Sequence, residues 1–208
     1  MTVALIDYGM GNLHSVAKAI ERAGGQVHLV KTPEELKTCD RIVLPGVGAF
    51  RDCIAALQKR GLDEAIREQC ATGEPFLGIC LGMQILLSRS FEFDEYKGLD
   101  MIPGDVVRFP ENFPKKGYKI PHMGWNGVLL PEETHPVLAP LKNRQCYFVH
   151  SYYCVPSDEA HTLAQCDYGD IRFVCAIGQG NVLGVQFHPE KSQAAGINLL
   201  ESFLQWNP

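Results

Sequence analysis

The first ninety residues alternate short aliphatic runs with segments whose apolar positions recur every three or four residues. The short runs predict strands, and the longer periodicity predicts helices. In chain order, the expected elements are strand Val3–Ile6, helix Asn12–Ala23, strand Val27–Val30, helix Pro33–Lys37, strand Ile42–Leu44, helices Ala49–Lys59 and Leu62–Cys70, strand Phe76–Ile79 and helix Gly82–Ser88. This order predicts a mostly parallel twisted sheet flanked by helices, with Phe76–Ile79 as a central buried strand.

After Ser90 the pattern changes to glycine, proline and aromatic residues, followed by strand-like runs with little helix between them. The expected elements there are strands Asp105–Phe109, Tyr147–Tyr153, Ile171–Ile177 and Asn181–Phe187, and a final helix over Ala194–Trp206. Gly178-Gln179-Gly180, between the last two strands, is a hairpin signal. Because no linker or repeat interrupts the chain, we expect one α/β domain over residues 1–208, with an antiparallel excursion in its C-terminal half.

Charge and composition exclude several classes of function. The 19 Lys and Arg residues against 24 Asp and Glu residues give a net charge of −5, without the basic stripe that captures nucleic acid or an anionic membrane. The longest apolar stretch, Pro75–Leu87, is shorter than the roughly 18 residues of a membrane span, and the N-terminal apolar run is too short for a signal peptide. The eight cysteines have no zinc-ligand spacing. We expect a cytoplasmic protein with reduced thiols and with no metal or cofactor.

A candidate nucleophile lies between a predicted strand and a predicted helix. Gly78-Ile79-Cys80-Leu81-Gly82 has the spacing glycine-x-nucleophile-x-glycine, which allows a sharp turn that projects the thiol at the carboxyl edge of the sheet. The start of the helix should lower the pKa of the thiol and offer the amide of Leu81 to an oxyanion. The alternative is that Cys80 is a small buried apolar residue, as we expect for the other seven cysteines.

A histidine and a glutamate two residues apart offer the base that such a thiol needs. His188-Pro189-Glu190 ends a predicted strand, and Pro189 favours an extended chain in which residues i and i+2 point to one face. Glu190 can then orient one ring nitrogen of His188 while the other faces Cys80, which favours a thiolate–imidazolium pair. Taken alone, His188 could be an ordinary strand-end residue and Glu190 a solvated charge.

At this point the sequence resembles the class I, triad-type glutamine amidotransferases, and the resemblance implies a flavodoxin-like fold. The matching segments are Pro45–Phe50, Gly78–Gln84 and Gly184–Ser192. The resemblance implies a catalytic triad of Cys80, His188 and Glu190, and an oxyanion hole formed by the backbone of Val47 and Leu81. It also implies a substrate-binding set of Gly46, Gly48, Gln84, Ser151 and Tyr152.

Each of these binding pieces also has a plain structural interpretation. The glycine loop could be an ordinary βα turn, Gln84 an ordinary helix-surface glutamine, and His150-Ser151-Tyr152 a buried aromatic strand with a satisfied histidine. The loop lies at the edge where α/β sheets build their sites. Gln84 follows Cys80 by one helical turn, so its side chain should face the same cleft.

Within the family, the resemblance narrows to the glutaminase subunits of imidazole glycerol phosphate synthases, in histidine biosynthesis. It is carried by Asp7–Leu13, Pro121–Asn126 and Tyr147–Tyr153, while Asp100 stands where a glycine is expected. It implies hydrolysis of glutamine to glutamate and ammonia through a cysteinyl thioester, and a heterodimer with a cyclase subunit that consumes the ammonia. The cyclase could dock on His122, Met123 and Trp125, because methionine and aromatic residues are enriched at interfaces. The alternative is a core hairpin with a buried Trp125.

Two rival classes stay open at the level of sequence. A stand-alone cysteine hydrolase, of peptidase or γ-glutamyl hydrolase type, could use the same turn without a partner protein. A redox-sensing module could use Cys80 as a low-pKa thiol, but it would need neither Glu190 nor two glycine loops at one edge.

Overall fold

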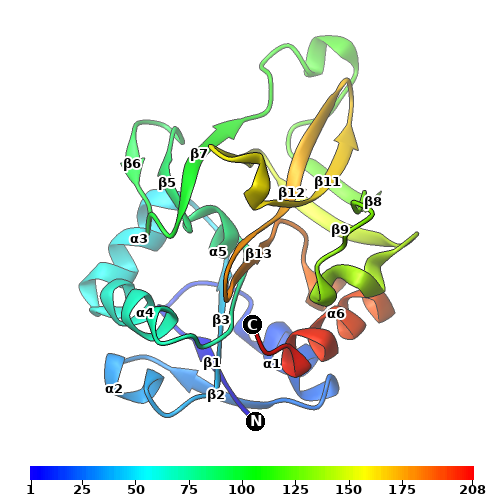
Figure 1. The fold of residues 1–208 in the computed structure, drawn as a ribbon. Helices are drawn as coiled ribbons and strands as arrows, with labels where there is room; N and C mark the ends of the chain where they lie inside the picture. The colour runs from blue at the N-terminus through cyan, green and yellow to red at the C-terminus, as the bar shows by residue number, and fades with distance from the viewer.

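Five parallel strands form one half of the main sheet (Figure 1). The structure is a computed structural model that describes residues 1–208. In spatial order these strands are β2 (Gln26–Val30), β1 (Thr2–Ile6), β3 (Arg41–Gly46), β4 (Phe76–Cys80) and β13 (Val182–Val185). The predicted parallel sheet is confirmed, and β4 is buried at its centre between β3 and β13.

Helices cover both faces of these parallel strands (Figure 1). They are α1 (Leu13–Arg22), α2 (Pro33–Leu36), α3 (Phe50–Lys59), α4 (Leu62–Ala71) and α6 (Gln193–Gln205). Along β1, Val3 and Leu5 join the core beneath α1 and α6, whereas Ala4 and Ile6 join the core beneath α3 and α4. Successive side chains of β1 therefore point to opposite faces of the sheet and pack into two separate hydrophobic cores. None of the helices is long and apolar enough to cross a membrane.

The C-terminal half adds the expected antiparallel excursion. Beyond β13 the sheet continues in the order β12-β10-β7-β5-β6, β11 pairs with β12, and β8 and β9 form a separate two-stranded sheet. The bounds are β5 (Leu87–Ser90), β6 (Tyr96–Lys97), β7 (Ile102–Arg108), β8 (His122–Gly127), β9 (Gln145–His150), β10 (Tyr152–Pro156), β11 (Thr162–Tyr168) and β12 (Ile171–Gln179). The predicted hairpin joins β12 to β13. Short 3₁₀ turns lie at Pro114–Lys116, Pro136–Leu141, Glu159–His161 and Pro189–Lys191.

The predicted helix over Gly82–Ser88 is wrong in length. Helix α5 spans only Leu81–Gln84, and the chain then enters β5. The carbonyl of Ile85 accepts the amide of Leu99 at 2.7 Å, and the carbonyl of Leu86 accepts the amides of Met101 and Ile102. These long-range hydrogen bonds replace those that a longer helix would have made.

The predicted single strand over Tyr147–Tyr153 is two strands in different sheets. Strand β9 pairs with β8, whereas β10 pairs with β7 and β12. The break falls at Ser151, whose carbonyl accepts the amide of Phe109 at 3.0 Å. Because strand propensity is continuous across this segment, only the change of pairing partner reveals the break.

Candidate active site

Cys80 occupies a strained position at the junction between β4 and α5. Its φ of 55° and ψ of −111° lie in a region that non-glycine residues rarely adopt, at a cost of about 1–3 kcal/mol. Such a conformation persists only where the surrounding structure enforces it, and it is typical of functional sites. The structure therefore places the predicted nucleophile on a sharp, strained turn.

Three glycines enforce this turn. A Cβ atom built on Gly78 would lie 2.4 Å from the carbonyl oxygen of Gly82, and one on Gly82 would lie 1.9 Å from the carbonyl oxygen of Leu44. A Cβ atom on Gly46 would lie 2.7 Å from the amide nitrogen of Gly82. Because any side chain would collide with backbone, β3, β4 and α5 can close around Cys80 only with glycine here. Gly46, a predicted substrate-binding residue, packs against the turn.

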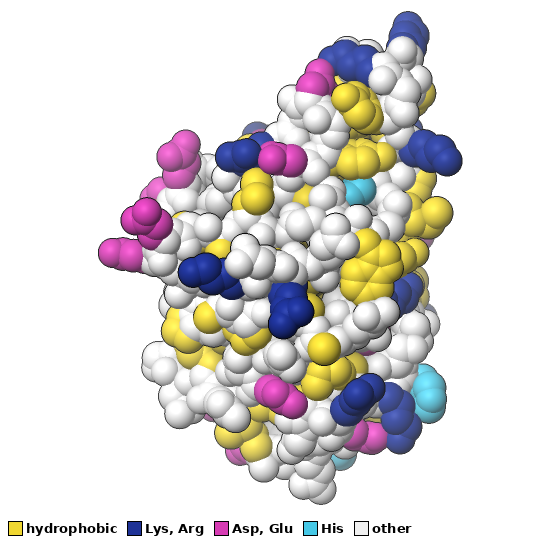
Figure 2. Space-filling model, turned by 90° about the vertical axis from the view of Figure 1, so that its right-hand side faces the viewer, with side chains coloured by type: hydrophobic (Ala, Val, Ile, Leu, Met, Phe, Trp, Pro, Cys, Tyr) yellow, Lys and Arg dark blue, Asp and Glu magenta, His cyan; other side chains and the backbone are white.

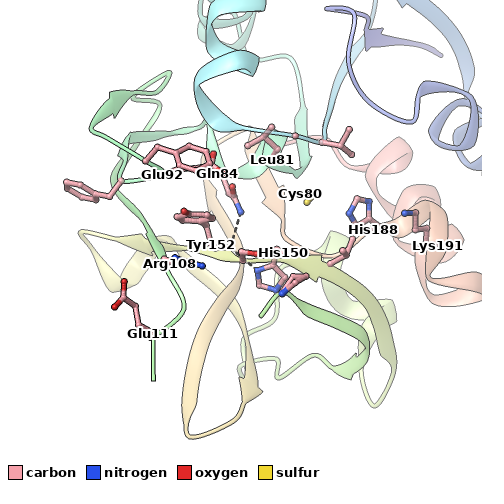
Figure 3. Close-up of a pocket in the computed structure, with 17 residues that line it drawn as sticks. Cys80, Leu81, Gln84, Glu92, Arg108, Glu111, His150, Tyr152, His188 and Lys191 are labelled. Carbon is pink, nitrogen blue, oxygen red and sulfur yellow. Dashed lines mark hydrogen bonds between the residues drawn. The ribbon is translucent and has the colours of Figure 1, made fainter. Parts of the chain in front are cut away.

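The sulfur of Cys80 lies in a cavity of about 810 Å³ where β3 and β4 end (Figure 3). The cavity brings together most of the site residues expected from the sequence, namely Val47, Gly48, Cys80, Leu81, Gln84, Ser151, Tyr152 and His188. Val47 is 42% exposed in the loop after β3. Glu190 does not line the cavity, because it lies behind His188. The two turns predicted to face an oxyanion therefore share one cavity with the thiol.

His188 and Glu190 form a buried ion pair beside Cys80. Nδ1 of His188 lies 2.8 Å from Oε1 of Glu190, and the two side chains are 4% and 2% exposed. Nε2 of His188 is buried and forms no hydrogen bond, and the ring points toward the sulfur of Cys80 (Figure 3). The order thiol, imidazole, carboxylate is the one that nucleophilic catalysis requires.

Cys80 and Glu190 together keep the imidazole of His188 protonated at neutral pH. Burial alone would lower the pKa of His188, but the Cys80 sulfur as thiolate and the Glu190 carboxylate favour the charged ring and raise this pKa to about 10. The sequence predicted that a helix dipole would activate the thiol. Because α5 has a single turn, its dipole is small, and the imidazolium of His188 provides the positive charge beside the sulfur.

Gln84 is an inward-facing residue, so the helix-surface alternative is wrong. Its side chain is 6% exposed, and Nε2 donates to the carbonyl oxygen of Tyr152 at 3.0 Å and to Oε1 of Gln186 at 2.9 Å. Both amide hydrogens are used, which leaves Oε1 as a free acceptor at the cavity. The predicted proximity of Gln84 to Cys80 is therefore present in the fold.

The segment His150-Ser151-Tyr152 combines both interpretations given above. Nδ1 of His150 donates to the carbonyl oxygen of Tyr152 at 2.8 Å, and burial lowers the pKa of His150 to about 3. His150 is thus a satisfied, neutral histidine. All three residues nevertheless line the cavity, because the chain turns at Ser151 between β9 and β10.

Several polar residues at the site were not expected from the sequence, among them Gln186, Glu92 and Arg108. Gln186 is fully buried with its Nε2 3.6 Å from Cys80 Sγ, and its place two residues before His188 was a usable signal. Glu92, in the loop after β5, and Arg108, at the end of β7, line the cavity, but no motif marks them. The fold brings no three His, Cys, Asp or Glu side chains together in a way that could hold a metal ion.

The three residues proposed for docking do not share one face of β8. Met123 and Trp125 are 66% and 44% exposed, whereas His122 is 3% exposed. His122 stacks on Phe148 and lies edge-on to Phe109. Because side chains alternate along a strand, His122 points into the core and cannot meet a partner. The alternative of a buried Trp125 is also wrong.

The α/β fold and the thiol–imidazole–carboxylate arrangement are typical of enzymes that use a cysteine nucleophile. Residues 4–206 match the family described as glutamine amidotransferase class-I, and the chain belongs to that family.

Several relatives match over nearly the full length. Proteins named imidazole glycerol phosphate synthase subunit HisH are 49% identical in Methylococcus capsulatus, over 100% of this chain and 97% of the relative, and 48% identical in Geobacter sulfurreducens, over 97% of each. Among solved structures, "Crystal structure of glutamine amidotransferase" has a TM-score of 0.72 at 20% identity, covering 98% of this chain and 97% of that one. "Structure of PurLQS from Thermotoga maritima" has a TM-score of 0.75 at 18% identity, with the same coverage. These two structures show the same fold.

The site geometry predicts that one thiol of eight reacts selectively. With limiting iodoacetamide at pH 7, Cys80 should be alkylated first, because it lines the cavity and the imidazolium of His188 stabilises its thiolate. The other cysteines are buried, and burial raises the thiol pKa to about 12 in Cys53, Cys70, Cys146 and Cys166. Peptide mass spectrometry measures the order of labelling. Glu190→Gln should slow labelling of Cys80 by about tenfold or more, and uniform labelling of all eight cysteines would contradict this prediction.

Proposed function

We propose that this chain is the glutaminase subunit of an imidazole glycerol phosphate synthase and supplies ammonia for histidine biosynthesis. The observation that carries the proposal is the buried Cys80, His188 and Glu190 arrangement at the cavity, in a chain matched along its length by subunits of that name. The whole chain, residues 1–208, would act as one amidotransferase domain on L-glutamine.

The first half-reaction forms a thioester. The thiolate of Cys80 attacks the side-chain carbonyl carbon of glutamine, and the carbonyl oxygen becomes an oxyanion. The backbone amides of Val47 and Leu81 would stabilise this charge, one donor contributing about 10²–10³-fold. The imidazolium of His188 then protonates the amide nitrogen, which leaves as ammonia.

The second half-reaction hydrolyses the thioester. His188, now neutral, takes a proton from water, and the resulting hydroxide adds to the thioester carbonyl. Collapse of this intermediate expels the Cys80 thiolate and releases glutamate, which restores the thiolate–imidazolium pair. Glu190 holds the Nδ1 hydrogen of His188 throughout, so Nε2 is the nitrogen that exchanges protons. This acid–base catalysis contributes about 10²–10⁴-fold.

The charges around the cavity suit the amino-acid end of glutamine. Figure 3 shows Glu92, Arg108 and Gln84 on one side of Cys80 and His188 on the other. Glutamine reaching Cys80 with its side chain would leave its zwitterionic end beside Arg108 and Glu92, which can bind a carboxylate and an ammonium group respectively. The free Oε1 of Gln84 offers a further acceptor. Gly48, Ser151 and Tyr152 would complete this subsite.

Ammonia released into water is protonated and lost, so the activity is useful beside a partner that consumes it. The partner would be a cyclase subunit that forms a heterodimer with this chain and uses ammonia to produce imidazole glycerol phosphate and an aminoimidazole carboxamide nucleotide. Met123 and Trp125 are exposed on β8, and the face that carries β8 and β9 presents hydrophobic side chains interspersed with Lys and Arg (Figure 2). This mixed surface suits a protein interface.

The proposed location is the cytoplasm. All eight cysteines are free thiols in the core, an arrangement that a reducing compartment maintains. This location also brings the enzyme to its soluble substrate.

The direct test is the release of glutamate from glutamine by the purified chain. We expect strong release only when a histidine-pathway cyclase subunit with its nucleotide ligand is added, and none from Cys80→Ala under the same conditions. Coupled glutamate dehydrogenase provides the measurement.

The other outcomes separate the rival functions. Glutamate release that depends on Cys80 but is the same with and without the cyclase would indicate a glutaminase that serves another synthase. No release in any mixture would contradict the proposal and favour a different cysteine hydrolase, or a sensor thiol.

The partner surface has its own test. Trp125→Ala should weaken cyclase binding by tenfold or more, because a large exposed aromatic residue is the typical energetic centre of an interface, and it should leave the unfolding midpoint unchanged. Leu29→Ala, which removes a 47% exposed side chain from β2 at the far edge of the sheet, is the matched control. Equal affinities of both variants and the parent protein in calorimetric titration would exclude Trp125 from the interface.

A further inference from the structure

Gln186 touches the reacting sulfur and has no role in the mechanism above. It follows β13, two residues before His188, and its side chain is completely buried. Its Nε2 lies 3.6 Å from Cys80 Sγ, and its Oε1 lies 2.9 Å from Nε2 of Gln84. A buried amide needs a partner at each end, and here those partners are the nucleophile and a residue of the cavity.

One backbone carbonyl fixes the direction of these hydrogen bonds. The carbonyl oxygen of Tyr152 can only accept, so the atom of Gln84 that lies 3.0 Å from it must be the amide nitrogen. The second hydrogen of that nitrogen points to Gln186, which must therefore present its oxygen. The nitrogen of Gln186 is left facing the sulfur of Cys80, as a donor.

The carbonyl oxygen of Tyr152 also accepts a hydrogen bond from His150, which is itself paired with His122 in the core. Nδ1 of His150 donates to Tyr152, so its Nε2 accepts from Nδ1 of His122 at 3.0 Å, and Nε2 of His122 accepts from Asn126 at 3.3 Å. Burial lowers the pKa of His122 to about 4 and that of His150 to about 3, so each neutral ring has one hydrogen to place. Every donor in this chain is matched to an acceptor, which holds the Tyr152 carbonyl in place.

We propose that Gln186 is a further catalytic residue, which donates an N–H hydrogen bond to the sulfur of Cys80 whenever that sulfur is a thiolate. Hydrogen bonds to charged acceptors are the strong ones. This one would stabilise the thiolate before it attacks and again when the thioester breaks, with no proton transferred from the amide. His188 approaches the same sulfur. The role in thioester breakdown rests on the proposed function, whereas the role at the resting thiolate does not.

The test measures the thiolate itself, in the full chain without glutamine or a cyclase. Gln186→Met keeps the length of the side chain but removes the donor. The rate of Cys80 alkylation by iodoacetamide is followed from pH 5 to pH 10, together with unfolding by urea. The other titratable groups that act on or near the Cys80 thiol are His188, Tyr8 and Cys154, and all three are unchanged in the variant. Gln179→Met, at an exposed position at the end of β12, is the matched control.

We expect Gln186→Met to slow alkylation at pH 7 by about tenfold to a hundredfold and to move the whole profile to higher pH, while Gln179→Met follows the parent protein. A folded Gln186→Met variant with the parent profile would overturn the proposal, since a residue that only fills space would alter unfolding and leave the thiol profile unmoved.

A second measurement needs no folded variant. The side-chain amide protons of Gln186 in the parent protein should shift in NMR spectra as the Cys80 thiol ionises, and their indifference to that ionisation would overturn the proposal. If the glutaminase assay failed, both results would still decide the role of Gln186, because neither uses glutamine.

Discussion

The site depends on one constraint, the strained backbone of Cys80. A positive φ at a residue with a side chain costs energy, and it is retained here because β4 enters the turn fully buried and α5 leaves it in van der Waals contact with β3. Gly78 and Gly82 remove the atoms that would push these elements apart. The same close approach brings the loop with Val47 to the cavity. The position of the sulfur is therefore set by the core of the sheet.

The second requirement is a buried charge pair whose two members face each other; Nε2 of His188 and Oε2 of Glu190 are buried and form no hydrogen bond. An imidazolium and a carboxylate are costly to bury unless they face one another, and His188 and Glu190 meet that condition through a hydrogen bond of 2.8 Å. The sulfur, in turn, has polar groups directed toward it from His188 and Gln186. These two groups place donors around the sulfur, which is the proposed nucleophile.

The sequence was sufficient for the features that rest on local chemistry. Glycine framing predicted the sharp turn at Cys80. The two-residue spacing of His188 and Glu190 predicted their contact, although Pro189–Lys191 is a 3₁₀ turn and not the expected extended segment. The alternation of strands and helices predicted the parallel sheet. Asp100 stands where a glycine was expected, and its φ is 52°. Glycine adopts such a positive φ more readily than other residues, which explains the expectation.

Features that depend on long-range pairing could not be predicted in this way. Helix α5 ends early because carbonyls after Gln84 bond to residues near position 100, and the break at Ser151 exists because two sheets compete for one segment. The inward orientation of His122 follows from the register of β8, which propensity does not reveal. Gln186 is recognisable only once Gln84 and Cys80 lie on either side of it.

The central claim is that His188 is held as an imidazolium by Cys80 and Glu190, and NMR titration of its ring measures this most directly. In protein with labelled histidine, the His188 signal should titrate far above the ordinary value of 6.5, near pH 10, and Cys80→Ala should move it to lower pH because one group that favours the charged ring is gone. A His188 ring that titrates at or below 6.5 in the parent protein, unaffected by Cys80→Ala, would contradict the claim.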